Sequence, residues 1–552
     1  MDESSLAILR ASCLRLAGEG RLKAALAFGP GAFGYGGRDE VAVMAIVGRL
    51  RPGVRCLRDR TSGAFFILVD SGLFEKDARR GVMGDLLADK LLVPYIPVHG
   101  ADHLEELEVA FKRRLAWELL LGLALSLPEF ATEMYIDPRY FLYETVLRMA
   151  RIMPSSAYMF ANLFSKPGDR RANEPRTMRG FLEALRSLEE AGYVGRDGPF
   201  IRPTGKLLRK KPRPHVLMDL AHRLGGALRG MSKHLLKVLP GIMRPYSMEK
   251  EAFMRRFGRR AGPLRSLPSP QSFLLLRTHI GLRPALAGVA LDEIARLVGP
   301  VGPGDDVRVS EIGGSLNVVY LVSVVGEEGQ VRFVVKHFKN WNNLKWLSLR
   351  LWSFGAKRFI ISGRERLKRE YTMCRRLGEL GFSVPKVFHV DLTNNSLVEE
   401  FIEGGNLATP IRDFLFGEEG ADVLRLLSEA GGLVARIHAY NMTLGDCKPE
   451  NIIIGPGGRL FLVDLEQASV GGEKAWDVAE FLYYSGHFAP QMADEEVFEP
   501  VARSFVRGYL EAGGPPEVVR EATSVKFARV FSFFTPSQVI RTIGRVCREE
   551  AA

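Results

Sequence analysis

The stretch Leu444-Gly-Asp-Cys-Lys-Pro-Glu-Asn-Ile-Ile-Ile454 carries more chemical information than any other part of this sequence. Asp446 and Asn451 stand five residues apart, just before an apolar run that predicts a buried strand. A loop of this length can turn both side chains toward one site, the carboxylate beside an acceptor hydroxyl and the amide beside a metal ion. Lys448 can neutralise charge on the transferring group. The spacing therefore favours phosphoryl transfer.

Two stretches flank this loop and add parts of the same chemistry. A turn with three glycines, Gly455-Pro-Gly-Gly458 followed by Leu460-Phe-Leu-Val-Asp464, places Asp464 at the end of a strand eighteen residues after Asp446. A carboxylate there can serve as the principal ligand of Mg²⁺. Upstream, Ser396-Leu-Val-Glu-Glu-Phe-Ile-Glu-Gly404 predicts a strand that ends in a glycine turn, which suits a hinge whose backbone recognises adenine. The candidate hinge residues are Glu400 and Ile402.

A second glycine turn lies further toward the N-terminus, in Gly313-Gly-Ser-Leu-Asn317. It separates two apolar runs, 307–312 and 318–324, that predict a β-hairpin. Glycine lets backbone N–H groups approach a phosphate closely. The candidate phosphate-binding residues of this turn are Gly313, Gly314, Ser315 and Asn317.

Lys336 follows the next apolar run, where a lysine can reach back over the glycine turn. A helix expected from about Glu365 to Leu380 supplies Glu370 as the partner that would hold this lysine. These residues complete the set that phosphoryl transfer needs, with ATP and Mg²⁺ as the implied cofactors.

The segment Gly445-Asp-Cys-Lys-Pro-Glu-Asn451 is similar to the catalytic loop of serine/threonine protein kinases. Val463-Asp-Leu-Glu466 stands in the place of their metal-binding D-F-G. The wider pattern resembles the atypical Bud32 and RIO families, with a basic insertion at 337–369 and a Bud32-like stretch from Leu377 to Phe388. The resemblance implies a two-lobed fold and transfer to a serine or threonine hydroxyl, on a protein substrate or by autophosphorylation. About a dozen residues separate Asp464 from Trp476, which implies no activation-loop control.

Some positions depart from the kinase pattern. Leu444 replaces the usual histidine of the loop, Gly445 replaces its arginine, and Glu466 replaces the glycine of D-F-G. The turn at 313–317 also resembles that of aminoglycoside and choline kinases, so a small-molecule kinase is an alternative. A further alternative is an ATP-binding, RNA-associated scaffold. An inactive kinase fold is disfavoured because Lys336, Asp446, Asn451 and Asp464 are all present.

The length of 552 residues predicts several domains. We expect a multidomain protein of the α/β and α+β classes, with a C-terminal two-lobed, protein-kinase-like fold at 301–552. The expected earlier parts are an α/β domain at 1–100, a helical region at 101–170, a winged-helix-like unit at 171–207 and a basic helical linker at 208–300. In the third of these, a helix at 178–191 precedes a hairpin that turns at Asp197-Gly198.

The first domain resembles a degenerate nucleotidyltransferase. Gly29-Pro-Gly-Ala-Phe-Gly34 followed by Asp39 is similar to that family's signature, in which a glycine-serine turn precedes two carboxylates on one strand. Pro30 stands in place of the serine and Val41 in place of the second carboxylate. Two-metal chemistry needs both acids on one face. Asp70 is a candidate later acid, but a fold retained for binding is the better interpretation.

The net charge of +12 is concentrated in the segment Lys206–Arg265, where sixteen Lys or Arg residues face three acids. Such a segment attracts phosphate polymers, and RNA or a ribonucleoprotein is the expected partner. The alternative is a solvated helical face with a linker. The prolines in the segment favour short helices over one long helix.

The remaining composition indicates a globular, cytoplasmic protein without a membrane partner. The longest apolar candidate, Leu119–Leu127, is too short to cross a bilayer, and the N-terminus carries acids where a secretory signal carries basic residues. Five scattered cysteines without a C-x-x-C pair predict neither a disulfide framework nor a zinc site.

Overall fold

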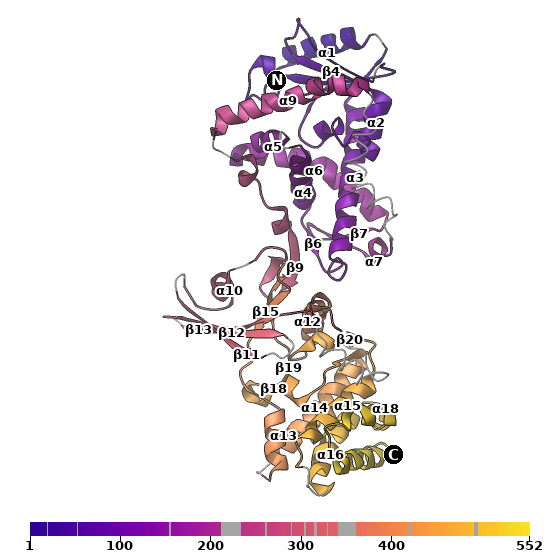
Figure 1. Ribbon diagram of the computed structural model, residues 1–552, viewed down its shortest axis with the longest axis vertical. Coiled ribbons are helices and arrows are strands. Elements are labelled where there is room, and N and C mark those ends of the chain that lie inside the picture. The colour runs from indigo at the N-terminus through magenta and orange to yellow at the C-terminus, as the bar shows by residue number, and fades with distance from the viewer. Residues whose placement is uncertain are drawn as a thin grey trace. The chain divides into compact units, whose positions relative to one another are not determined.

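The computed structural model describes residues 1–552 except 19, 52, 154–155, 211–232, 260–261, 289, 303–304, 314–316, 328, 341–359, 418–420 and 491–494. The chain forms two compact units, Met1–Leu276 and Arg277–Ala552 (Figure 1). Helices and several sheets occur in both, so the prediction of a mixed, multidomain α/β protein is confirmed. Within the described ranges, no helix combines the length and the apolar character that spanning a membrane requires.

The first unit begins with a five-stranded sheet of order β3-β4-β2-β1-β5. Its strands are β1 (Leu22–Phe28), β2 (Ala42–Val47), β3 (Val54–Arg58), β4 (Phe65–Asp70) and β5 (Ile96–His99). All six residues of β2 are buried, as expected of a continuous apolar run in a central strand. β2 and β4 run parallel, whereas the other neighbours are antiparallel. Helix α1 (Glu3–Ala17) packs its Cys13 into the core on one face.

Helices dominate the rest of the first unit. They are α2 (Ser71–Arg80), α3 (Ala101–Ser126), α4 (Arg139–Ile152), α5 (Ser156–Phe164), α6 (Pro167–Glu190), α7 (Gly205–Leu208) and α9 (Lys233–Phe257). The hairpin predicted after residue 193 is confirmed as β7 (Val194–Asp197) and β8 (Phe200–Pro203), with Gly198 at φ 58° in its turn. β8 pairs with β6 (Tyr135–Ile136), which pairs with β9 (Leu274–Thr278).

Helix α9 corrects the expectation of short helices in the basic segment. It runs for 25 residues with Pro240 and Pro245 inside it. An interior proline costs about 3 kcal/mol in a helix that nothing else supports. Here α9 packs against α5 and β3, and this burial holds the helix together across the prolines. Its most buried side chains are Ile242, Tyr246, Glu249, Ala252 and Phe253.

The second unit contains a five-stranded antiparallel sheet of order β11-β12-β13-β15-β14. The strands are β11 (Asp306–Gly313), β12 (Val318–Gly326), β13 (Gly329–His337), β14 (Val387–Asp391) and β15 (Ser396–Glu400). Helix α12 (Gly363–Glu379) lies between β13 and β14 in the chain and contacts β14 and β15. Strands β11 and β12 confirm the strands predicted at 307–312 and 318–324. Before this sheet come β10 (Gly281–Pro284) and α10 (Leu291–Val298), whose Ile294 and Ala295 join the core of the sheet.

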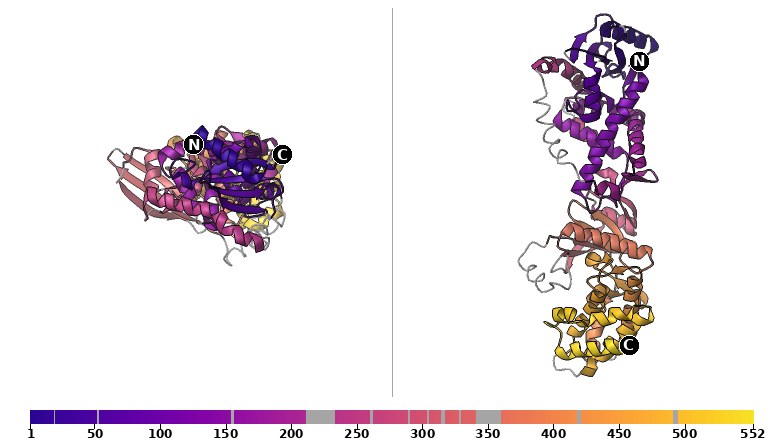
Figure 2. Two further views of the ribbon diagram at one scale, coloured as in Figure 1. Left: turned by 90° about the horizontal axis from the view of Figure 1, so that it is seen from above. Right: turned by 90° about the vertical axis from the view of Figure 1, so that its right-hand side faces the viewer.

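The remainder of the second unit is mostly helical, with two small sheets. Its helices are α13 (Ala408–Leu415), α14 (Ala421–Ala439), α15 (Lys474–His487), α16 (Glu495–Glu511), α17 (Pro516–Ala522), α18 (Val525–Phe531) and α19 (Ser537–Glu550). The short strands are β16 (Gly405–Asn406), β17 (Met442–Thr443), β18 (Ile452–Ile454), β19 (Leu460–Leu462) and β20 (Ser469–Val470). In Figure 1 and in the right-hand view of Figure 2, these orange-to-yellow helices form a layer separate from the salmon strands of the larger sheet.

Candidate active site

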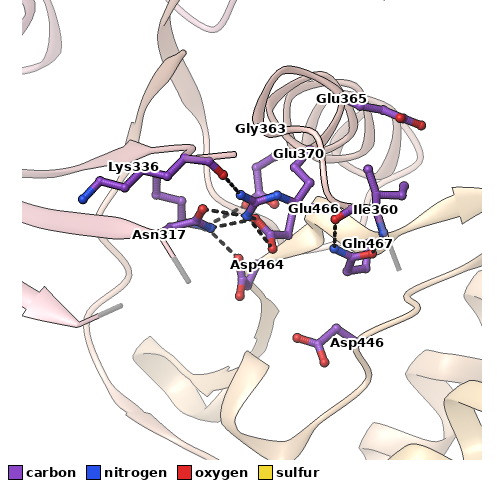
Figure 3. A network of polar contacts seen from close by, with 12 residues as sticks. Asn317, Lys336, Ile360, Gly363, Glu365, Glu370, Asp446, Asp464, Glu466 and Gln467 are labelled. Atoms are coloured by element: carbon purple, nitrogen blue, oxygen red, sulfur yellow. Dashed lines mark hydrogen bonds and ion pairs between the residues drawn. The ribbon is translucent and has the colours of Figure 1, made fainter. Parts of the chain in front are cut away.

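Lys336 lies on β13 and contacts three acids, of which Figure 3 labels Glu370 and Asp464. The lysine residue is only 7% exposed, because the apolar residues of this strand carry it into the interior. Its Nζ lies 2.7 Å from Glu370 on α12, so the predicted pair is present. Two further carboxylates contact it, Glu399 at 2.9 Å and Asp464 at 3.8 Å. The structure thus gives this lysine one more buried acid than the sequence analysis assigned to it.

The charges in this cluster shift one another's titration. Burial by itself lowers the pKa of Lys336, but the negative charges of Glu370, Glu399 and Asp464 outweigh it and raise that pKa well above its usual value. Burial raises the pKa of Glu370 and of Glu399, and the nearby Lys336 opposes that effect. Lys336 is therefore a permanent cation at neutral pH, as a phosphate-binding lysine must be.

The predicted catalytic loop follows β17 and brings Asp446, Lys448 and Asn451 together. Lys448 Nζ lies 2.6 Å from Asp446 Oδ1. Asn451 Nδ2 donates to Asp446 Oδ2 at 3.1 Å and to the Asp446 carbonyl at 2.9 Å. Burial by itself lowers the pKa of Lys448, but the charge of Asp446 outweighs it and raises the pKa above its usual value. Both oxygens of Asp446 are engaged, which fixes the direction of its carboxylate.

A buried set of side chains on α14 and α15 holds this loop in place, although no motif in the sequence pointed to it. Asp477 accepts the backbone N–H groups of Leu444 at 2.6 Å and Gly445 at 2.7 Å. His438 lies 3.1 Å from the same carboxylate. Glu480 accepts the N–H of Cys447 at 2.8 Å. In the sequence, Trp476 served only to measure the distance from Asp464, and only the fold shows that the Asp477 and Glu480 carboxylates face the loop.

Asp464 follows the β18–β19 hairpin and adopts a left-handed conformation, with φ 58° and ψ 57°. Few non-glycine residues occupy this region, and the strain suits a residue whose direction matters. The backbone supports it, because Val463 N–H donates to the Asn451 carbonyl at 2.9 Å and so ties the strand end to the catalytic loop. The Asp464 side chain is 37% exposed. It is therefore accessible to a ligand on one side while it faces Lys336 on the other.

Glu466 fills the position of the missing D-F-G glycine and joins a buried network (Figure 3). Arg366 of α12 donates to Glu466 at 2.8 Å and to Asn317 at 2.6 Å, and Asn317 Nδ2 donates to Glu466 at 2.7 Å. Burial and the nearby Asp464 raise the pKa of Glu466 to about 7. Asn317, predicted to bind phosphate, is 7% exposed and engaged in this network. Gly313 ends β11, and Gly314 and Ser315 lie outside the described residues.

The predicted hinge follows β15. Glu400 is the last residue of that strand. Its carboxylate accepts a hydrogen bond from Lys386 Nζ at 3.2 Å, just before β14 begins. Ile402 is half-buried in the short connection to β16. The expectation that the backbone of this hinge recognises adenine stays a prediction.

The candidate acids of the first unit do not form a two-metal site. Asp70 caps α2, accepting the N–H of Leu73 at 3.1 Å, and it also accepts the N–H of Leu50 at 3.0 Å. In the parallel β2–β4 pair, Asp70 is opposite Val47, whereas Asp39 precedes the other end of β2. A strand rises about 3.3 Å per residue, so the two acids lie at opposite ends of the sheet.

The described part of the basic segment is partly neutralised within the first unit. Arg255 of α9 lies 2.6 Å from Glu40, and Arg256 lies 2.7 Å from Asp169. Residues 211–232 of the segment lie outside the described ranges. The net positive charge of the sequence therefore overstates the charge that the described residues of α9 present to a partner.

The donor set fits a hard divalent cation. Asn451 uses its Nδ2 for hydrogen bonds to Asp446, which leaves its Oδ1 as the atom suited to a metal. The partly exposed carboxylate of Asp464 supplies further oxygen atoms. Mg²⁺ prefers such oxygen ligands and keeps several waters when it binds nucleotide phosphates. Lys336, Asp446, Asn451 and Asp464 together fit a kinase-like phosphotransferase.

Comparison with known proteins supports this class. No model of a known protein family matches the chain. The KEOPS complex subunit Bud32 of Pyrococcus abyssi is 27% identical over 154 residues, which cover 27% of this chain and 66% of that protein. The probable serine/threonine-protein kinase BUD32 homolog of Archaeoglobus fulgidus is 27% identical over 121 residues, which cover 21% of this chain and 60% of that protein. The chain thus spans slightly less than two thirds of these relatives, and the similarity supports an atypical, Bud32-type kinase region in part of it.

Proposed function

We propose that the second unit is an atypical serine/threonine protein kinase that transfers the γ-phosphoryl group of ATP to a protein hydroxyl. The observation that carries this proposal is that Lys336 contacts Glu370 and Asp464 while Asn451 contacts Asp446. The backbone joins the two groups, because the N–H of Val463, next to Asp464, donates to the Asn451 carbonyl. The Archaeoglobus relative, whose name describes a probable serine/threonine-protein kinase, supports the same reaction class. The acceptor is a serine or threonine of a partner or of the chain itself.

In this mechanism, Lys336 binds the ATP phosphates and Glu370 keeps its ammonium in position. Asp464 and Asn451 would hold Mg²⁺, which neutralises the charge of the phosphates when bound. Asp446 receives the acceptor hydroxyl. Lys448 and Asn451 fix the direction of the Asp446 carboxylate, which orients that hydroxyl. As the acceptor oxygen bonds to the γ-phosphorus, the bond from that phosphorus to ADP breaks and the hydroxyl proton passes to Asp446. Lys448 then stabilises the negative charge that develops on the transferring group.

Transfer of label from γ-labelled ATP tests the proposal. The full chain is incubated with Mg²⁺ and a mixture of protein substrates, and label is followed in the chain and in the substrates. We expect Asp446→Asn and Asp464→Asn each to reduce transfer by about 100-fold or more. Asp413→Asn, a matched change at a partly exposed aspartate on α13, should transfer like the wild type. Undiminished labelling in both site variants would contradict the proposal.

The acceptor distinguishes the alternatives. A small-molecule kinase would label a low-molecular-weight alcohol and leave protein unlabelled. The name of the Pyrococcus relative places that protein in a complex, and we propose that this chain also works in an assembly, with RNA or ribonucleoprotein as the partner of its basic segment. Turnover that changes with added RNA, with a steep dependence on salt, supports this partner. RNA binding without any transfer would favour a scaffold.

A further inference from the structure

Glu399 occupies a place in the cluster that the proposed reaction does not account for. It lies on β15, next to the strand that carries Lys336. In the β13–β15 register, Lys336 is opposite Leu397, so Glu399 is two residues along and points to the same face of the sheet. Diagonal neighbours of this kind are within reach of long side chains. The sheet itself therefore delivers this carboxylate to Lys336.

The contact is direct and buried. Glu399 Oε1 lies 2.9 Å from Lys336 Nζ, and Glu399 is only 2% exposed. The other buried partner, Glu370, is on α12 and lies 2.7 Å from the same nitrogen. Glu370, Cys374 and Glu399 have ligand atoms within 4.8 Å of one another, a spacing able to surround a cation. The ammonium of Lys336 contacts both carboxylates and so provides that positive charge.

We infer that Glu399 is a second positioning residue for Lys336, which keeps the lysine directed toward the nucleotide phosphates even when Glu370 is removed. This inference rests on the proposed function, because it assigns ATP phosphates to Lys336. The two acids differ in what holds them. Glu370 depends on the position of α12, whereas Glu399 and Lys336 belong to one sheet and keep their relation through backbone pairing.

Affinities for ATP and for adenosine test the inference without any need for transfer. We compare the full chain with Glu370→Gln, Glu399→Gln and the double variant, in the presence of Mg²⁺. Each single change should weaken ATP binding by about tenfold, as expected for one charge-assisted hydrogen bond. The double variant should weaken it by clearly more than the product of the two. Adenosine has no phosphates, so its affinity should stay within about twofold throughout.

The control is Glu379→Gln, which makes the same chemical change on the same helix at an exposed glutamate paired with Arg375. It should bind both ligands like the wild type. If Glu399→Gln leaves ATP affinity unchanged, alone and in the Glu370→Gln background, the inference is wrong. It is also wrong if ATP and adenosine affinity fall together, since that pattern indicates a purely structural role.

The same experiment separates this inference from the proposed function. A wild-type chain that binds ATP but labels no acceptor would refute the kinase assignment, and the affinity comparison would still decide the role of Glu399. A wild-type chain that binds no ATP would overturn both.

Discussion

Gly404 is a residue at which the backbone leaves room for no other side chain. Its φ is 142°, and a Cβ atom there would lie 2.0 Å from the carbonyl oxygen of Ile454. This approach brings the end of the hinge against β18, the strand that follows the catalytic loop. A substitution would have to separate the two segments. The close packing of the hinge against β18 thus requires that residue 404 has no Cβ atom.

We predict that Gly404→Ala lowers the free energy of unfolding of the second unit by about 2 kcal/mol or more, through backbone strain and the clash with Ile454. Gly405→Ala is the matched control, because its Cβ would meet nothing within 4 Å. Urea denaturation of the full chain measures both. Equal stability of the two variants would show that the segment can shift without strain.

Arg366 is a fully buried cation, and its charge is balanced by the carboxylate of Glu466. It is 0% exposed and links α12 to Glu466, two residues beyond Asp464. Removal of one partner leaves a buried charge without compensation, which typically costs 3–5 kcal/mol, about the same as a large cavity. Replacement of both partners by apolar residues is often close to neutral.

We therefore expect Arg366→Met to destabilise the second unit by about 3 kcal/mol, and the double variant Arg366→Met/Glu466→Leu to recover most of that loss. The midpoint of thermal unfolding measures the change. If the double variant is as unstable as the single one, the packing of the arginine side chain, and not its charge, is what stabilises the unit.

At the scale of elements, helix α9 carries a buried acid, Glu249. Glu249 lies on its inner face, where Asn162 donates to it at 2.7 Å and Tyr35 at 3.2 Å. Burial raises the pKa of this carboxyl from 4.5 to about 7, with Glu40 adding to the rise and Lys90 opposing it. Burial in the folded state therefore favours the protonated form of Glu249 over the ionised form.

The sign of the pH dependence follows from this shift. The stability that Glu249 contributes is complete below pH 4.5 and is lost as the pH rises through about 7, because the folded state must then ionise a buried acid or open. The loss amounts to roughly 3 kcal/mol. We predict that Glu249→Gln removes this slope between pH 5 and 7.5 in chemical denaturation, whereas Glu251→Gln, an exposed position on α9, keeps it. Parallel slopes in wild type and Glu249→Gln would contradict the assignment.

At the scale of the whole molecule, each of the two units has a core of its own. The first core surrounds the sheet of β1–β5, and the second surrounds β12, β13 and β15. The candidate active site draws all its residues from the second unit. Separate cores and a site in one unit predict that ligand binding stabilises one part of the chain selectively.

We predict that calorimetry shows two unfolding transitions. ATP with Mg²⁺ should raise the midpoint temperature of only one of them, that of the second unit. Ligand at about 100 times its dissociation constant should add about 2.7 kcal/mol to that unit. Lys336→Met should abolish the shift and leave the other transition unchanged. A single transition that moves as a whole would show that the two units unfold together.

The local chemistry of the chain determined much of this picture. Apolar runs of strand length predicted the strands around Lys336, and the spacing of Asp446, Asn451 and Asp464 predicted a site that phosphoryl transfer requires. Helix α12 carries Glu365, Glu370 and Glu379, so chain order alone did not select a partner for Lys336. The Lys336–Glu370 pair was predicted only as part of the whole set of kinase-like residues. Periodicity and spacing act over short distances along the chain, so they are visible in the sequence itself.

Only the tertiary structure decided the rest. Glu399 became a partner of Lys336, 63 positions away in the chain, through the register of two paired strands. Asp477 reached the catalytic loop from a later helix. Helix α9 continues across two prolines because it is buried against α5 and β3. These features depend on contacts between distant segments, and the burial that makes them favourable exists only after the chain has folded.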